Sequence, residues 1–232
     1  MLGILREHLK YCLTVIGARV KPHTLHQFLM VVNYMKIGLW MRNHGFNFGL
    51  RVRDRNEVFS IVANQITDKK VLYLEFGVFK GESMRFWSRE LKHPNANLHG
   101  FDSFEGLPED FDVDGPYTIG TFDVDGAIPQ IEDSRVKFFR GWFDQVLISY
   151  TAPPHEVLVI VMDADLYSST IYVLRHFKSI IREGTFIFFD EMSRPEHEPK
   201  AFDEFMKETG LKFIPICSDL GLNRVFFKCI GC

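Results

Sequence analysis

The chain has 232 residues, a formal net charge of −3 at pH 7 and 23 phenylalanines. This length and apolar content predict a single domain with a sizeable core, and they exclude a disordered protein or a small disulfide scaffold. Because the charge is near balance, we expect neither nucleic acid nor an anionic membrane as a partner.

The N-terminal part, residues 1–65, predicts a helical extension ahead of a domain that spans residues 66–232. Apolar residues recur at helical spacing in residues 2–15, 25–40 and 58–65. Residues 42–55 are rich in Asn, Gly and Arg and predict a loop. We expect the extension to act as a lid or to contact another subunit in a homo-oligomer.

Neither the extension nor the cysteines indicate export or a membrane span. The apolar run 28–41 contains Asn33 and Lys36 and is too short to span a bilayer. The first ten residues are charged and show no cleavable signal peptide. Free thiols in a reducing cytoplasm are therefore expected for the four cysteines, Cys12, Cys217, Cys229 and Cys232.

From residue 71 onward, strand and helix patterns alternate and predict an α/β domain. The runs 157–162 and 186–189 are apolar throughout, as in parallel strands buried on both faces. The last two strands are joined by residues 218–223, which suffice for a hairpin but not for a crossover. The pattern therefore predicts a mostly parallel sheet with an antiparallel last strand, typical of the class I methyltransferase fold. The seven predicted strands are 71–76, 98–101, 136–139, 157–162, 185–189, 211–216 and 224–228, and the helices between them are 82–91, 142–149, 167–182 and 199–209.

The first of these strands ends in an acid and runs into a glycine turn. Glu75 closes the strand, Gly77 and Gly81 follow, and a helix opens near Ser83. Glycine lets backbone approach a ligand, and free N–H groups at a helix start can bind a carboxylate. Glu75 can meet an ammonium group or, through water, a ribose. The turn thus predicts a cofactor with a positive centre and a carboxylate, although an ordinary strand–turn–helix has the same spacing.

Asp102 ends the second strand, 27 residues after Glu75. In nucleotide-binding α/β units an acid at this place commonly binds ribose hydroxyls. An Asp–Ser pair is equally typical of a residue that caps the following turn. We therefore expect Asp102 and Ser103 at the cofactor, with turn capping as the alternative.

Residues 104–131 predict a long irregular loop, and loops of this length in compact domains are usually functional. Residues 110–115 imitate the start of a calcium-binding loop. Calcium is rejected because Thr121 stands where an EF-hand needs Glu, and because Pro108 and Pro116 argue against flanking helices. The segment predicts an acid-rich lid.

A second group of acids follows two buried strands. Asp163 and Asp165 come after strand 157–162, and Asp190 and Glu191 come after strand 185–189. Neighbouring strands lie about 4.8 Å apart, so Asp163 and Asp190 should reach one ion at the carboxyl edge of the sheet. Crowded carboxylates call for a cation, and an all-oxygen shell favours Mg²⁺. As alternatives, Asp165 caps the next helix and Glu191 is a solvated loop residue.

Five blocks of the chain resemble the macrocin-type sugar O-methyltransferases, a family that methylates deoxysugar hydroxyls of natural products. The block Asp-Ser-Phe-Glu-Gly-Leu-Pro at residues 102–108 is the most specific. The resemblance implies a Rossmann-like class I fold, S-adenosylmethionine and Mg²⁺ as cofactors, and a sugar or glycosylated metabolite as acceptor. The matching blocks, in order between residues 71 and 205, are 75–83, 101–109, 140–143, 163–170 and 189–191.

The resemblance also implies roles for individual residues. Asp163, Asp190 and Glu191 would hold Mg²⁺. Two departures are Ala164, where the family usually has Gly, and Glu191, where it usually has Asp. The residues expected at S-adenosylmethionine are Glu75, Gly77, Gly81, Ser83, Asp102, Ser103 and Asp163, with Gly141 and Trp142 near its adenine.

In-line methyl transfer needs a general base that removes the hydroxyl proton as the oxygen attacks. Asp163 is the first candidate, Asp165 the second and His197, in the loop after strand 185–189, the third. Catechol-type O-methyltransferases place a lysine base three residues after the first metal Asp. Leu166 stands there in this chain, so a lysine base at that position is excluded.

Other functions stay open at this stage. One is a metal-dependent O-methyltransferase that acts on a phenolic or catechol-like hydroxyl. Another is a nicotinamide-dependent Rossmann oxidoreductase, although its fingerprint needs a glycine where Phe79 stands. A non-catalytic binding module is disfavoured, because a scaffold gains nothing from crowded carboxylates.

Overall fold

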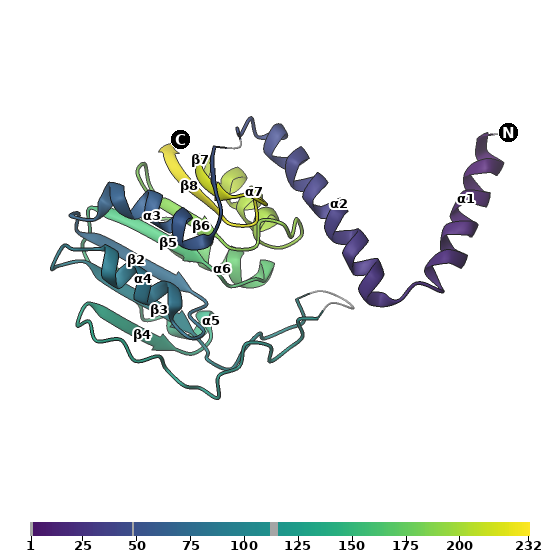
Figure 1. The fold of residues 1–232 in the computed structure, drawn as a ribbon. Helices are drawn as coiled ribbons and strands as arrows, with labels where there is room; N and C mark the ends of the chain where they lie inside the picture. Colours follow the sequence, from purple (N-terminus) through teal and green to yellow (C-terminus); the bar gives the residue numbers. More distant parts are fainter. Residues whose placement is uncertain (1, 48, 112–115) are drawn as a thin grey trace.

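The computed structural model describes residues 2–47, 49–111 and 116–232, so Asp112 and Asp114 of the calcium-like motif lie outside the described residues. The described chain forms one eight-stranded sheet in the order β1-β7-β8-β6-β5-β2-β3-β4, with helices on both faces (Figure 1). The strands are β1 (Leu50–Val52), β2 (Val71–Phe76), β3 (Asn97–Asp102), β4 (Val136–Arg140), β5 (Val157–Met162), β6 (Phe186–Phe189), β7 (Lys212–Asp219) and β8 (Val225–Gly231). The helices are α1 (Leu2–Gly17), α2 (Pro22–Asn43), α3 (Arg55–Ile66), α4 (Glu82–Glu90), α5 (Phe143–Val146), α6 (Tyr167–Phe177) and α7 (Glu198–Thr209).

The sheet confirms the predicted fold class. Only β8 runs antiparallel to its neighbours, β6 and β7, and the other strand pairs are parallel. One strand more is present than the sequence predicts, because β1 lies in the stretch 42–55 that predicts a loop. β1 is a three-residue edge strand that pairs with β7 from Leu50↔Cys217 to Val52↔Asp219. Its partner lies so far along the chain that no local pattern reveals the pairing.

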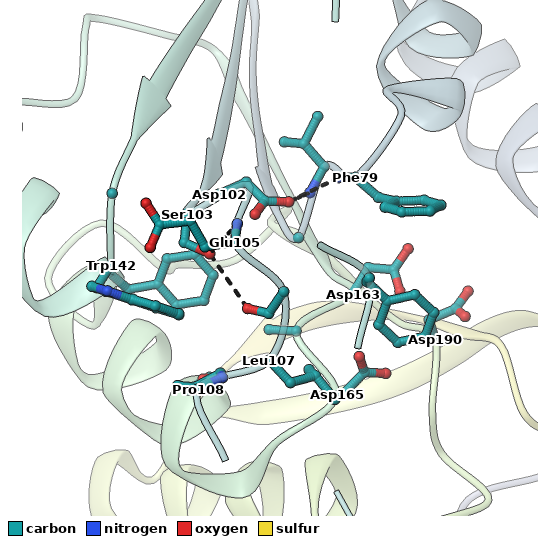
Figure 2. Close-up of a pocket in the computed structure, with 18 of the residues that line it drawn as sticks. Phe79, Asp102, Ser103, Glu105, Leu107, Pro108, Trp142, Asp163, Asp165 and Asp190 are labelled. Atoms are coloured by element: carbon teal, nitrogen blue, oxygen red, sulfur yellow. Dashed lines mark hydrogen bonds between the residues drawn. The ribbon is translucent and has the colours of Figure 1, made fainter. Parts of the chain in front are cut away.

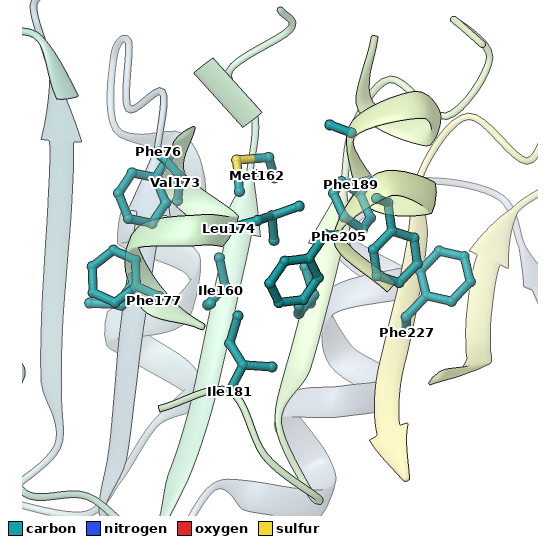
Figure 3. Close-up of a cluster of buried hydrophobic side chains, with 14 of the residues drawn as sticks. Phe76, Ile160, Met162, Val173, Leu174, Phe177, Ile181, Phe189, Phe205 and Phe227 are labelled. Atoms are coloured by element: carbon teal, nitrogen blue, oxygen red, sulfur yellow. The ribbon is translucent and has the colours of Figure 1, made fainter. Parts of the chain in front are cut away.

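Alternation along the central strands builds a core on each side of the sheet. In β2, Leu74 and Phe76 point to the cluster under α6 and α7, whereas Val71 and Tyr73 point to the cluster under α3 and α4. Figure 3 shows the first cluster, where Phe76 faces Phe177 of α6. Each fully buried Phe or Leu contributes about 1.5–3 kcal/mol relative to exposure. The two cores therefore hold the strand ends, and with them the site, in fixed positions.

The helix after β5 ends earlier than the sequence predicts. α6 ends at Phe177, and a turn follows in which the N–H groups of Ile180 and Ile181 both donate to the carbonyl of Phe177. Ile181 is buried in the core beneath that turn.

Helices α1 and α2 extend away from the sheet and form the two limbs of a V (Figure 1). One stripe of α2 packs on the domain through Asn33, Ile37 and Met41, which are buried. In the part of the chain that the structure describes, no helix combines the length and apolarity that a membrane span requires.

Candidate functional site

The carboxyl ends of β2, β3, β5 and β6 border a cavity of about 900 Å³ (Figure 2). A volume of this size is typical of small-molecule and cofactor sites. Three residues of the predicted site, Glu75, Gly81 and His197, do not line it. The predicted residues that do line it are Gly77, Ser83, Asp102, Ser103, Gly141, Trp142, Asp163, Asp165, Asp190 and Glu191.

The two glycines of the turn have different roles. Gly77 has φ +89°, and a Cβ on it would collide with the backbone carbonyl of Asp163 at the tip of the neighbouring strand. Gly81 has φ +74° and precedes α4, where a Cβ would press on the ring of Pro129, 2.9 Å away. Gly77 therefore allows two strand ends to meet at the cavity, whereas Gly81 allows the long loop to pack on α4.

Asp102 ties the glycine turn to the turn after β3. Its Oδ2 accepts hydrogen bonds from the N–H groups of Val78 (2.7 Å) and Phe79 (2.8 Å), and its Oδ1 accepts one from Phe104 (2.7 Å). Ser103 Oγ accepts a hydrogen bond from the N–H of Glu105 at 3.1 Å. The turn-capping alternative is thus present in the structure, and both residues still line the cavity (Figure 2).

Glu75 lies beneath the cavity rather than in its wall. The carboxyl group is 1% exposed and accepts a hydrogen bond from the Tyr73 hydroxyl at 3.1 Å. Burial raises the pKa of Glu75 to about 8, against the opposing effects of Tyr73 and Arg55. Ser83, which does line the cavity, also opposes the rise in the pKa of Glu75 and so lies close to this buried acid.

Asp163 and Asp190 do face one cation, and that cation is the guanidinium of Arg55. Arg55 Nη1 lies 3.0 Å from Asp163 Oδ2 and 3.6 Å from Asp190 Oδ1. Asp190 Oδ1 also accepts a hydrogen bond from Arg224 Nε at 2.9 Å. Burial and the neighbouring Asp190 raise the pKa of Asp163, and Arg55 opposes that rise. The negative charges of Asp163 and Asp190 are therefore balanced by arginine side chains of the same chain.

Asp165 has an unusual backbone. Its φ is +59°, a left-handed conformation that costs a non-glycine residue on the order of 1 kcal/mol or more. The residue before α6 is Leu166, and the N–H of Tyr167 at the start of that helix donates to His197 rather than to Asp165, so the capping interpretation of Asp165 is wrong. Burial, with Asp190 nearby, raises the pKa of Asp165 to about 7. The strained turn places this carboxyl group in the cavity wall (Figure 2).

Glu191 is separated from the Arg55 pair. Its nearest ion-pair contact is Arg194, with 3.9 Å between Glu191 Oε2 and Arg194 Nε. Its backbone N–H donates to the buried carboxyl group of Glu198 at 2.7 Å. Burial raises the pKa of Glu191 to about 8, with smaller contributions from Asp190 and Asp165. Within residues 2–47, 49–111 and 116–232, no three His, Cys, Asp or Glu residues form a group that could hold a metal ion.

The contacts of His197 give it a structural role. It precedes α7, its Nδ1 accepts a hydrogen bond from the backbone N–H of Tyr167 at 3.3 Å, and its ring lies 4.5 Å from that of Phe111. It joins the starts of α6 and α7 beside the cavity, and it does not line the cavity. This arrangement does not favour His197 as a base.

Sequence reasoning missed Arg55, and it predicted the long loop as an acid-rich lid without naming the loop residues that line the cavity. Arg55 lines the cavity from the start of α3. Residues 105–108, 119, 120 and 122 of the loop contribute to the wall, and the Phe122 ring lies 5.7 Å from that of Phe79. Ser168 Oγ donates to Glu109 at 2.6 Å and fastens the loop to α6. An excess of acids over nearby bases was the one signal in the sequence that could have prompted a search for a basic partner.

Comparisons with known proteins identify the family of this chain. The family model of macrocin O-methyltransferase (TylF) matches residues 51–227. Mycinamicin III 3''-O-methyltransferase of Micromonospora griseorubida is 28% identical over an aligned length of 142 residues, and the match covers 53% of this chain and 55% of that protein. The 8-demethyl-8-(2,3-dimethoxy-alpha-L-rhamnosyl)-tetracenomycin-C 4'-O-methyltransferase of Streptomyces olivaceus is 30% identical over an aligned length of 136 residues, and the match covers 51% of each chain. The chain spans about half the length of these curated relatives.

Solved structures share the fold. A calicheamicin methyltransferase has a TM-score of 0.55 at 18% identity and covers 75% of this chain and 76% of its own. The O-methyltransferase NovP has a TM-score of 0.51 at 23% identity, with the same coverage of 75% and 76%. At these identities the likeness shows the fold, and it confirms the predicted class I methyltransferase architecture. The family match favours methyl transfer over the nicotinamide-dependent alternative.

Proposed function

Because the chain belongs to the macrocin O-methyltransferase family, we propose that it is an S-adenosylmethionine-dependent enzyme that methylates a hydroxyl of a sugar or glycosylated metabolite. Both curated relatives are named for O-methylation of glycosylated compounds, which supports this acceptor class. The observation that carries the proposal is the cavity itself. Its β2–β3 side is formed by turns, glycines and an aromatic ring, and its β5–β6 side by carboxylates.

The β2–β3 side suits S-adenosylmethionine, which would supply an electrophilic methyl group. Gly77 and Gly141 line this side of the cavity, where the Asp163 carbonyl and the Val146 side chain occupy the space that a Cβ would need, and Trp142 offers a flat apolar surface. Ser83 at the start of α4 and the N–H groups of that helix start, which has no side-chain cap, suit a carboxylate. Asp102 would accept hydrogen bonds from ribose hydroxyls through the lone pairs that its backbone partners leave unused.

On the β5–β6 side we assign the general base to Asp165. Asp163, the first candidate from the sequence, is held by Arg55, whereas Asp165 is placed in the cavity wall by a strained turn. Asp165 would accept the proton of the acceptor hydroxyl as the methyl group is transferred to the hydroxyl oxygen, and the cofactor would leave as a neutral thioether that keeps the electron pair of the broken S–C bond. Asp163 and Asp190 remain as acceptors that orient the substrate hydroxyls.

The Mg²⁺ site stays a prediction. Asp163, Asp190 and Glu191 offer the oxygen donors that Mg²⁺ prefers. Their arrangement in the structure does not fit the ion, because Arg55 lies between the first two and Glu191 turns toward Arg194. We therefore assign the positive charge at the acid pair to Arg55.

The proposal is tested by incubating the protein with S-adenosylmethionine and a panel of free and conjugated sugars, with Mg²⁺ in one arm and EDTA in the other. Mass spectrometry should show a methyl gain on a sugar hydroxyl. Methylation of catechols alone would favour the phenolic alternative. Cofactor binding without methylation of any hydroxylated acceptor would overturn the proposal. Asp165→Asn, which removes the base at constant volume, is the matched control.

A further inference from the structure

The exposed apolar surface of this protein is concentrated on its N-terminal helices. Of the 24 large apolar side chains exposed in the described residues, 14 lie between Ile4 and Leu39. Leu5 and Met35 are 71% and 72% exposed. So many exposed apolar side chains on two helices indicate an interaction site, because soluble monomers rarely expose large apolar surfaces.

Helix α2 is apolar on more than the side that it packs against the sheet. Asn33, Ile37 and Met41 form its buried stripe, at a spacing of four residues. Phe28 and Val31, on other sides of the helix, are 65% and 60% exposed. A helix that is apolar all round belongs inside a helical assembly, whereas a helix lying on a membrane needs one clearly polar face. The pattern of α2 therefore favours a protein partner over a lipid surface.

The distribution of charge along the chain indicates which protein the N-terminal helices contact. Residues 1–47 carry six basic side chains and one acidic side chain, a net charge of +5. Because the whole chain carries −3, residues 48–232 carry −8. The N-terminal helices and the domain of another copy thus attract each other. The six basic residues are Arg6, Lys10, Arg19, Lys21, Lys36 and Arg42.

We propose that α1 and α2 form an arm that packs on a second copy of this chain. In the resulting dimer, the arm of each copy packs on the domain of the other. An exchange of this kind buries the same patch on both copies, as a two-fold dimer requires. Fourteen exposed large side chains offer an area on the order of 1,000 Å² per copy, against about 800 Å² per partner in a standard interface.

The arm leaves the domain beside the cavity. His44, just after α2, contacts Asp203 of α7 at 2.9 Å, and Lys36 lies 3.9 Å from Glu196 in the loop that follows Glu191. The arms, the long loop and the carboxyl ends of the parallel strands lie on the same side of the molecule, to the right in Figure 1. The second copy would therefore stand over the entrance to the cavity.

The test is the mass of the full chain in solution, measured by light scattering after size exclusion at about 50 µM. A protomer has a mass of 27.0 kDa, and we expect at least twice that mass. Phe28→Glu combined with Met35→Glu should give monomers. Ile148→Glu, which changes an 80% exposed apolar residue on the domain, should leave the assembly intact. Thermal unfolding of each variant checks that the domain is folded.

Three results would overturn the proposal. One is a monomeric wild-type chain at this concentration, and another is an assembly that the Phe28/Met35 double variant leaves unchanged. The third is a monomer that cosediments with phosphatidylglycerol vesicles through the arm, which would assign the arm to a lipid surface. None of these measurements involves methyl transfer, so they fail or succeed independently of the proposed activity.

Discussion

Replacing Arg55 with Met tests whether a guanidinium neutralises the acid pair. The change removes the charge 3.0 Å from Asp163 and 3.6 Å from Asp190 and keeps the apolar stem of the side chain. Removing one partner of a buried ion pair costs about 3–5 kcal/mol. Because the Arg55 and Asp163 side chains are each 25% exposed, we expect a loss of about 2–3 kcal/mol in the free energy of unfolding at pH 7.5.

The loss should depend on pH in a defined direction. Without Arg55, the pKa of Asp163 rises further, because Arg55 is the group that lowers it. The folded variant then binds protons that the unfolded chain has released, so its stability falls as pH increases. The deficit relative to wild type should therefore shrink when the pH is lowered from 7.5 to 5.5.

Urea unfolding at both pH values measures this effect, with Arg53→Met as the matched control on an exposed neighbour. Magnesium provides a second comparison. A dication that takes the place of the guanidinium should stabilise Arg55→Met and leave the wild type almost unchanged. The reasoning is refuted if Arg55→Met unfolds like Arg53→Met, or if Mg²⁺ stabilises wild type and variant equally.

Three further predictions concern the turn, the base and a buried histidine. Gly77→Ala should cost more than about 3 kcal/mol in urea unfolding, because the new Cβ meets the Asp163 carbonyl, whereas Gly184→Ala, at a similar φ of +90° but in open space, should cost only about 1 kcal/mol. Asp165→Asn should lower kcat by roughly 10²–10⁴-fold with little change in S-adenosylmethionine affinity by calorimetry, and retention of wild-type kcat would remove Asp165 as the base. Burial lowers the pKa of His99 to about 4, so the unfolded chain binds the extra proton between pH 4 and 6.5 and stability should rise with pH across that window. The rise is about 3 kcal/mol, and His99→Asn should show a flatter profile in pH-dependent unfolding.

The sequence was sufficient where a pattern has one structural solution. Strands β2 and β5 were predicted at their observed bounds, and the continuous apolar run of β5 is typical of a strand buried on both faces. The convergence of Asp163 and Asp190 followed from neighbouring strands ending at one edge. Both inferences use geometry that is local to a strand or shared by adjacent strands.

The rest of the site depends on contacts that no local pattern contains. Arg55 meets Asp163 across 108 positions of sequence, so nothing near either residue indicates the pair. Gly81 was assigned to the cofactor because a glycine that admits a ligand and a glycine that admits the ring of Pro129 look alike in a sequence. His197 was a candidate base until its neighbours, Phe111 and Tyr167, were known.

The source of the counter-charge bears on how the N-terminal region is organised. The parallel strands bring acids to one edge of the sheet, and the cation between Asp163 and Asp190 comes from the first residue of α3. α3 also buries Val58, Phe59, Val62, Ala63 and Ile66, a contribution on the order of 10 kcal/mol, comparable to the whole stability of a domain. The family match begins at residue 51, just ahead of this helix. Residues 1–65 therefore contain two parts that are stabilised in different ways. The arm, α1 and α2, has an exposed apolar face that we propose is covered by another copy. The segment formed by β1 and α3 completes the sheet and supplies the cation at the acid pair.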